Sequence, residues 1–476
     1  MSGADAARRA ARRQAAWLFA LALALRLAMA AFAASRFPPA DDGIFYHAVA
    51  LRISQGLGYT WAWPDGAVTF AAHYPVGYPA LLGAVYALLG ASASSAMLLQ
   101  ALLGALLVLA VHACALNFTT PGRARLAALA MALHPTFVLY TAALMTEAVA
   151  AAVLLLLVTV ALWARGRSAG WRVLLGALGA GLLLIRPQLL PWLPLVGAVA
   201  VQGPGEASSL RSWLRWSRGG AEVLLLSVLL CLPWTLRNCS KMDGCVFVSA
   251  NGGWNLLIGT LPEGDGSFAP IAGPTVPIEC RNVFGEAGKD RCFGHAGMRR
   301  IEADPAAWLR LAPRKLGQLF NHGAVASSYL ATSNSTLVTD STRHRIATLE
   351  TLYGRLLLLG ACWGLFRAAS RRAGQGLALA AAAFALSPWG YMAELCVLAG
   401  LLVERPDPGR RPLPFLAAGL LGLCVLTHIV FFGAPRYALP WLPWLSLLMI
   451  LPAGHRPGGV TKLRTESFDS GIPSGR

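Results

Sequence analysis

Charged residues are scarce in this sequence: Asp, Glu, Lys and Arg together make up only 13% of its 476 residues. Soluble domains usually carry about 25%, so the chain has too little charge to cover a water-facing surface. The sequence also lacks a Walker A motif and a GxGxxG motif behind a strand, which excludes the common nucleotide-binding domains. It shows no internal repeat of the kind found in many transporters. An enzyme of this composition would need its activated substrate delivered within the membrane.

Hydrophobic residues are abundant and make up 56% of the chain. They gather in runs of about 17 residues or more, each long enough to cross a bilayer, and these runs lack the alternation of β-barrel strands. The pattern predicts an all-α polytopic membrane protein with about 10–12 transmembrane helices. We expect residues 1–455 to form the transmembrane domain and the Gly/Ser/Pro-rich residues 456–476 to form a disordered cytoplasmic tail.

Basic residues between the apolar runs predict the orientation of the chain. Short loops rich in Lys and Arg mark the cytoplasmic side, and they occur near residues 8–13, 123–125, 165–172, 211–218, 367–372, 405–411 and 456–464. Both termini are therefore expected in the cytoplasm, with the first apolar run (17–34) retained as a span. The richness in Ala and Arg is compatible with a bacterial source, so we expect the protein to lie in a bacterial inner membrane. The net charge of +18 is dispersed among the loops, which argues against nucleic-acid binding.

Two long polar segments lie outside the membrane in this topology, the first long loop (residues 36–79) and the second long loop (residues 237–345). The second holds four of the nine cysteines, namely Cys239, Cys245, Cys280 and Cys292. An even number facing an oxidising space permits two disulfides, although four free thiols are the alternative. Of the three possible pairings, the local one joins Cys239 to Cys245 and Cys280 to Cys292. In the run 376–403, residues 387–390 (SPWG) are a plausible break between two short passes.

Several polar residues converge on the predicted outer ends of the spans: Asp41, Asp42, Glu147, Arg186, Arg237, Asn238 and Arg436. Each has a simple explanation by itself. The aspartates could cap a helix, Glu147 could complement a helix dipole, and the arginines could be interfacial anchors. Their shared side nevertheless indicates one polar cavity that contains acids and cations. Arg26 lies within a span, where we expect it in a structural ion pair.

Short motifs follow one another in a fixed order along residues 20–455. They are Arg26, DGIFYH at 42–47, GLGY at 56–59, YPVGYP at 74–79, MTE at 145–147, LIRP at 184–187, PWTLRN at 233–238, SANGGWNL at 249–256 and RYALP at 436–440. This ordered set resembles the GT-C glycosyltransferases related to protein O-mannosyltransferases and the aminoarabinose lipid A transferase. The sequence departs from that pattern in two places. It has Asp41-Asp42 where many relatives have Asp-Glu, and its region 376–403 is longer.

The resemblance implies a GT-C fold and an inverting transfer of a sugar from a polyprenyl-phosphate donor to an acceptor hydroxyl on the outer face. A carboxylate would act as the base, and we assign this role to Asp42, with Asp41 as the alternative. Arg436 would hold the leaving phosphate, helped by Arg237 or Arg186. Glu147 would pair with Asp42 to bind a divalent cation or would orient the acceptor. The resemblance adds further donor-site residues: His47, Asn238, Asn251, Asn255 and Tyr437.

Two other functions remain open from the sequence. A transporter or flippase for a lipid-linked glycan would place its polar groups near the bilayer midplane on broken helices, whereas here they lie at the outer rim. A non-catalytic assembly subunit would tolerate the loss of Asp42. The residues do not identify the sugar, or whether the acceptor is a protein, a lipid or a glycan.

Overall fold

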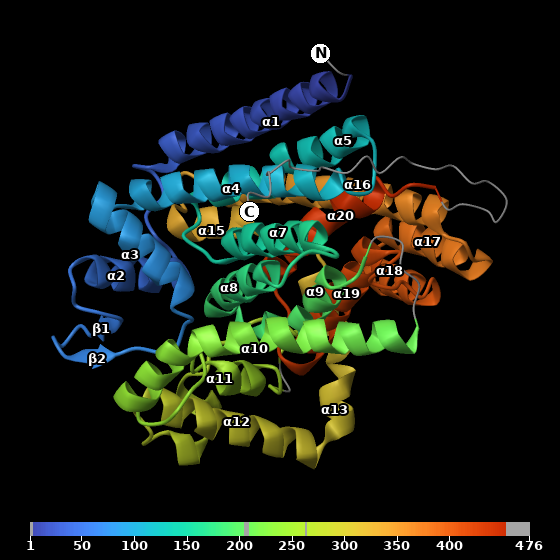
Figure 1. The fold of residues 1–476 in the computed structure, drawn as a ribbon. Coiled ribbons are helices and arrows are strands. Elements are labelled where there is room, and N and C mark those ends of the chain that lie inside the picture. The colour runs from blue at the N-terminus through green and yellow to red at the C-terminus, as the bar shows by residue number, and fades with distance from the viewer. Residues whose placement is uncertain (1–2, 204–208, 262–263, 454–476) are drawn as a thin grey trace, which may run out of the picture.

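The computed structural model describes residues 3–203, 209–261 and 264–453, with the side chains of residues 3–8 left aside. Within these residues the chain forms twenty α-helices, a few short 3-10 helices and one two-stranded sheet (Figure 1). The predicted all-α class is therefore confirmed. The predicted tail at 456–476 lies outside the described residues, and the proposed domain boundaries stay predictions.

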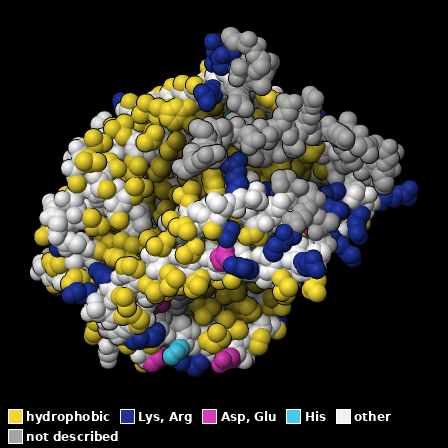
Figure 2. Space-filling view, viewed as in Figure 1, with side chains coloured by type: hydrophobic (Ala, Val, Ile, Leu, Met, Phe, Trp, Pro, Cys, Tyr) yellow, Lys and Arg dark blue, Asp and Glu magenta, His cyan; other side chains and the backbone are white. Residues whose placement is uncertain are grey.

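Six helices are long and apolar enough to cross a membrane, judged by length and composition. They are α1 (Gly3–Ala33), α4 (Ala93–Ala115), α7 (Glu147–Ala164), α10 (Leu210–Lys241), α16 (Asp340–Ala368) and α19 (Pro412–Val430). Shorter apolar helices accompany them: α3 (Gly77–Leu89), α8 (Gly170–Ile185), α9 (Leu193–Ala200) and α18 (Tyr391–Val403). Figure 2 shows apolar side chains across much of one face, as lipid contact requires. The chain is a membrane protein, as predicted.

Proline decides where two of the apolar runs are interrupted. The apolar stretch at 126–142 does not form one helix, because α5 (Pro121–Ala132) ends before His134 and α6 (Pro135–Leu139) begins a new turn. Proline has no N–H to donate and disfavours the helical conformation in the residue before it. The expected break near Pro388 is confirmed, since α17 (Arg372–Ala385) and α18 are separated there. By contrast, α10 continues through Pro233.

The first long loop folds into α2 (Asp42–Ser54) and a hairpin of β1 (Thr60–Ala62) and β2 (Val68–Phe70), with Trp61 opposite Thr69. The second long loop begins at the end of α10 and contains α11 (Gly252–Ile258), α12 (Glu286–Ala303), α13 (Pro305–Arg310), α14 (Ala312–Leu319) and α15 (Ala326–Ser333). Its disulfides follow the local pairing, Cys239–Cys245 and Cys280–Cys292. The remaining helix, α20 (Leu442–Met449), packs against α16.

Arg26 does not form the expected ion pair in the described part of the chain. Its side chain is fully buried in α1 and donates to the carbonyls of Ala22, Met131 and Ala132 at 3.1–3.4 Å. Met131 and Ala132 close α5, where the last carbonyls of a helix lack internal partners. The partial negative charge of that helix end thus takes the place of a carboxylate.

Candidate active site

Asp41 and Asp42 form the turn that opens α2. Neither caps the helix as the simple explanation requires, because Asp41 occupies the cap position at φ 49° without a side-chain cap bond. The Asp42 carboxylate instead accepts a hydrogen bond from the Tyr74 hydroxyl at 2.7 Å. Its second oxygen pairs with Nη1 of Arg436 at 2.9 Å. The helix-capping explanation is therefore wrong for this pair.

A second carboxylate meets the same arginine. Glu147 is the first residue of α7 and pairs with Arg186, while Nε of Arg436 lies 3.8 Å from its Oε1. The Tyr140 hydroxyl donates to its other oxygen at 3.1 Å. Asp42, Arg436, Glu147 and Arg186 thus form a row of alternating charge, called the charged row below. Buried charges need such compensation, since an unpaired one is costly.

The two carboxylates of the charged row differ in access to solvent. The Asp42 side chain is 23% exposed, whereas the Glu147 side chain is 1% exposed. An incoming hydroxyl group can therefore reach Asp42 but not Glu147. The neighbouring Asp41 has a pKa that burial raises, that Arg436 lowers in part, and that Asp42 raises further. Within the charged row, Asp42 is therefore the more accessible carboxylate, while Asp41 beside it is exposed; the assignment of Asp42 as the base, with Asp41 as the alternative, stays a prediction.

Four distant segments supply the charged row: the starts of α2 and α7, the end of α8, and a 3-10 turn (Pro435–Ala438) behind α19. The last turn is held by the second long loop. Gly433 donates its N–H to the Gly266 carbonyl at 2.8 Å, and a Cβ at Gly433 would lie 1.9 Å from the Lys315 carbonyl oxygen. Lys315 donates to the Ile429 carbonyl at the end of α19, and burial lowers its pKa to about 8.

The ring of Tyr437 lies against two arginines of the charged row, while its predicted donor-binding role stays a prediction. The guanidinium carbons of Arg436 and Arg186 lie 5.1 and 5.4 Å from the ring centroid, and His428 stacks on the ring at 5.1 Å. A cation over an aromatic face is stabilised by the ring quadrupole. Tyr437 therefore helps to bring two arginines close together.

The other predicted donor-site residues have different neighbours. Arg237 donates to the carbonyls of Ala71 and Tyr59, both at 2.7 Å, and so holds the hairpin of the first long loop. Asn238 is buried and donates to the carbonyls of Val246 and Val248.

His47 bonds to the Tyr86 hydroxyl at 2.7 Å, Asn251 accepts from Ser249, and Asn255 is half-buried in α11. Within the described part of the chain, the contacts given for these side chains do not involve the charged row, so their donor-binding roles stay predictions. Three tyrosines that were not assigned a role, Tyr74, Tyr140 and Tyr329, do contact the site or its turns. No local spacing signal points to Tyr140 or Tyr329.

The arrangement of Asp42 and Glu147 does not fit a divalent cation. Arg436 contacts both carboxylates, and the described residues contain no group of three or more His, Cys, Asp or Glu side chains placed to hold a metal ion. Metals of the Mg²⁺ or Ca²⁺ kind need several oxygen ligands. No step of the reaction proposed below is therefore assigned to a cation.

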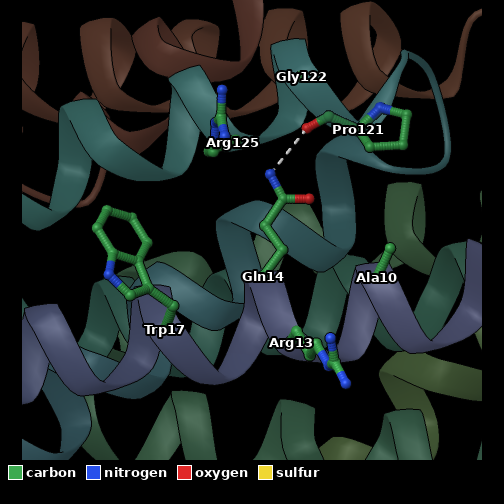
Figure 3. Close-up of a pocket in the computed structure, with 7 residues that line it drawn as sticks. All are labelled: Ala10, Arg13, Gln14, Trp17, Pro121, Gly122 and Arg125. Carbon is green, nitrogen blue, oxygen red and sulfur yellow. Dashed lines mark hydrogen bonds between the residues drawn. The ribbon is translucent and has the colours of Figure 1, made fainter.

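A cavity of about 470 Å³ lies elsewhere, between the N-terminal part of α1 and the start of α5 (Figure 3). Arg13, Gln14, Trp17 and Arg125 line it, and Gln14 donates to the Pro121 carbonyl at 3.2 Å. Asp42 follows the opposite end of α1. This cavity is therefore separate from the charged row.

Known proteins offer only distant similarity. No protein-family model and no curated protein matches this chain. Among solved structures, it is similar to the oligosaccharyltransferase AglB of Archaeoglobus fulgidus in complex with an inhibitory peptide and a dolichol-phosphate (12% identity, TM-score 0.42). It is also similar to ArnT of Cupriavidus metallidurans bound to undecaprenyl phosphate (15% identity, TM-score 0.40). Both matches cover 91% of this chain, which spans 50% of the AglB chain and 76% of ArnT. Similarity at this level does not establish a shared activity.

Proposed function

We propose that this protein is an inverting GT-C glycosyltransferase of the bacterial inner membrane. It would move a hexosyl or pentosyl unit from a polyprenyl-phosphate donor to an acceptor hydroxyl on the outer face, where the acceptor is a protein, a lipid or a glycan. The observation that carries the proposal is the charged row, in which a reachable carboxylate lies 2.9 Å from an arginine at the ends of apolar helices. The ordered motifs in the sequence support the same reading.

The proposed chemistry follows from the attacking group, an acceptor hydroxyl, and the leaving group, a lipid phosphate. The acceptor oxygen attacks the anomeric carbon while Asp42 takes its proton, and the bond from that carbon to the phosphate oxygen breaks. The leaving lipid phosphate keeps the electron pair, and Arg436 and Arg186 would stabilise its charge. One displacement inverts the anomeric centre.

Arg436 also connects the donor to the base. A phosphate that bonds Arg436 competes with Asp42 for the same guanidinium, so donor binding would free a carboxylate oxygen to accept the proton. Tyr74 keeps the other oxygen in place during this exchange. The ion pair with Glu147 would hold Arg186 beside Arg436, so that a second cation faces the donor phosphate.

The test is transfer by the purified protein in liposomes with a panel of radiolabelled polyprenyl-phosphate sugars and crude envelope acceptors. Asp42→Asn should abolish transfer while donor binding persists, because the amide cannot take a proton. Asp65→Asn, on an exposed hairpin turn, is the matched control and should transfer like wild type. Donor that crosses the bilayer without transfer, equally in all variants, would identify a transporter for lipid-linked glycans instead.

A further inference from the structure

The hydroxyl of Tyr329 connects the two turns that carry the acids of the charged row. It accepts hydrogen bonds from the backbone N–H of Ala40 at 3.1 Å and of Leu144 at 3.2 Å. Ala40 immediately precedes the Asp41–Asp42 turn, and Leu144 lies three residues before Glu147. The Tyr329 side chain is 4% exposed, so water cannot readily replace either bond. One oxygen atom thus ties the start of α2 to the segment that leads into α7.

The packing around this oxygen leaves little room for movement. A Cβ at Gly43 would lie 2.8 Å from the Tyr329 hydroxyl and 3.1 Å from the Leu144 carbonyl oxygen. Glycine therefore allows the first turn of α2 to rest directly on both. The rings of Tyr140 and Tyr329 lie 6.4 Å apart, and Tyr140 itself donates to Glu147. The Tyr329 hydroxyl is thus linked to Asp42 through the backbone of Ala40 and to Glu147 through the backbone of Leu144.

Helix α15, which carries Tyr329, is held at its N-terminal end by a buried carboxylate. Glu350 on α16 accepts bonds from the N–H groups of Ala326 and Ser327 at 2.9 and 3.2 Å, and from the Ser327 hydroxyl at 2.7 Å. These bonds satisfy free N–H groups at the helix start. They also anchor α15 to α16, one of the six helices long and apolar enough to cross a membrane.

The other end of α15 is tied to the first long loop. The Ser333 hydroxyl donates to the Pro38 carbonyl at 2.5 Å, and the Asn334 amide donates to the Arg36 carbonyl at 2.8 Å. Together with the bond from Ala40, three contacts hold residues 36–40 along one short helix. The position of the chain that leads into Asp42 is therefore fixed by α15, a segment nearly three hundred residues away in sequence.

We infer that Tyr329 is a positioning residue for the proposed transfer and that α15 sets the spacing between Asp42 and Glu147. The inference rests on the proposed function. Arg436 contacts both acids, so a shift of either turn changes the position of the arginine relative to the base. Misplacement by about 1 Å can reduce a rate by about a hundredfold. Tyr329 acts through the backbone and has no contact with the reacting atoms.

Tyr329→Phe removes the hydroxyl and keeps the ring. We expect kcat to fall roughly ten- to a hundredfold with little change in donor binding, because Arg436 and Arg186 remain. The matched control is Tyr353→Phe on α16, which removes a half-buried hydroxyl that donates to one backbone carbonyl, that of Ala130, at 2.7 Å. This variant should keep the wild-type kcat.

Hydrogen–deuterium exchange of the substrate-free protein tests the same contact independently of catalysis. In Tyr329→Phe, peptides that contain Ala40 and Leu144 should exchange faster than in wild type, whereas in Tyr353→Phe they should not. Unchanged exchange, or an equal loss of kcat in both variants, would overturn the positioning role while leaving the transferase proposal intact. Wild-type protein that transfers no sugar would overturn the proposed function, and with it the catalytic meaning of the contact.

Discussion

Replacing Glu147 by Gln tests whether the charged row is held together by charge. Glu147 is the most buried member of the row and the shared partner of Arg186 and Arg436. Glutamine has nearly the same volume and can still accept a bond from Tyr140. The substitution therefore removes mainly the negative charge, and it leaves two cations with Asp42 as their remaining anion.

The size of the effect follows from the burial of this pair. Removing one partner from a buried ion pair costs about 3–5 kcal/mol, because the other charge stays buried without compensation. We expect the lower end, about 3 kcal/mol, since Asp42 still pairs with Arg436. At about 2 °C for each kcal/mol in a large chain, the melting temperature should fall by about 6 °C.

The assay is a thermal melt in detergent of wild type, Glu147→Gln, Arg186→Gln and the double variant. Removing both charges restores the balance, so the double variant should melt above Glu147→Gln. A double variant whose loss equals the sum of the two single losses would refute the reasoning. So would a Glu147→Gln protein that melts with wild type.

Three further changes probe the surroundings of the site. Tyr74→Phe removes a hydrogen bond to a charged Asp42, worth about 1.5–3 kcal/mol, so kcat for sugar transfer should fall roughly ten- to a hundredfold; an unchanged rate would mean that Asp42 is oriented without it. Gly433→Ala would place a Cβ 1.9 Å from a backbone oxygen and should lower the melting temperature, whereas Gly181→Ala, which meets nothing within 4 Å, should not. Burial lowers the pKa of Lys315 to about 8 in the folded protein, compared with about 10.4 in the unfolded chain. Between these two pH values the unfolded chain binds more protons than the folded protein. Wild type should therefore gain stability over Lys315→Met as pH rises from 8 to about 10, and parallel melting curves for the two proteins would contradict this.

Local composition was sufficient for much of the fold. The apolar runs predicted helices, because a segment in lipid must satisfy its own backbone hydrogen bonds. The break near Pro388 and the local disulfides also depend on residues close in sequence. The same holds for the placement of acids and arginines at helix ends, where charge is least costly. The break at His134–Pro135 had an equally local cause, but the length of the apolar run concealed it.

The partners of these polar residues were decided by the tertiary structure. Arg186 and Arg237 both lie near helix ends and look equivalent in sequence, yet Arg186 pairs with Glu147 and Arg237 binds two backbone carbonyls. Tyr329 contacts Leu144 across a separation of 185 residues. Such choices depend on which helix ends meet after packing, and contacts between distant segments leave no periodic signal in the chain. Sequence therefore determined the helices and the chemical groups available at their ends, while packing determined which of those groups form the site.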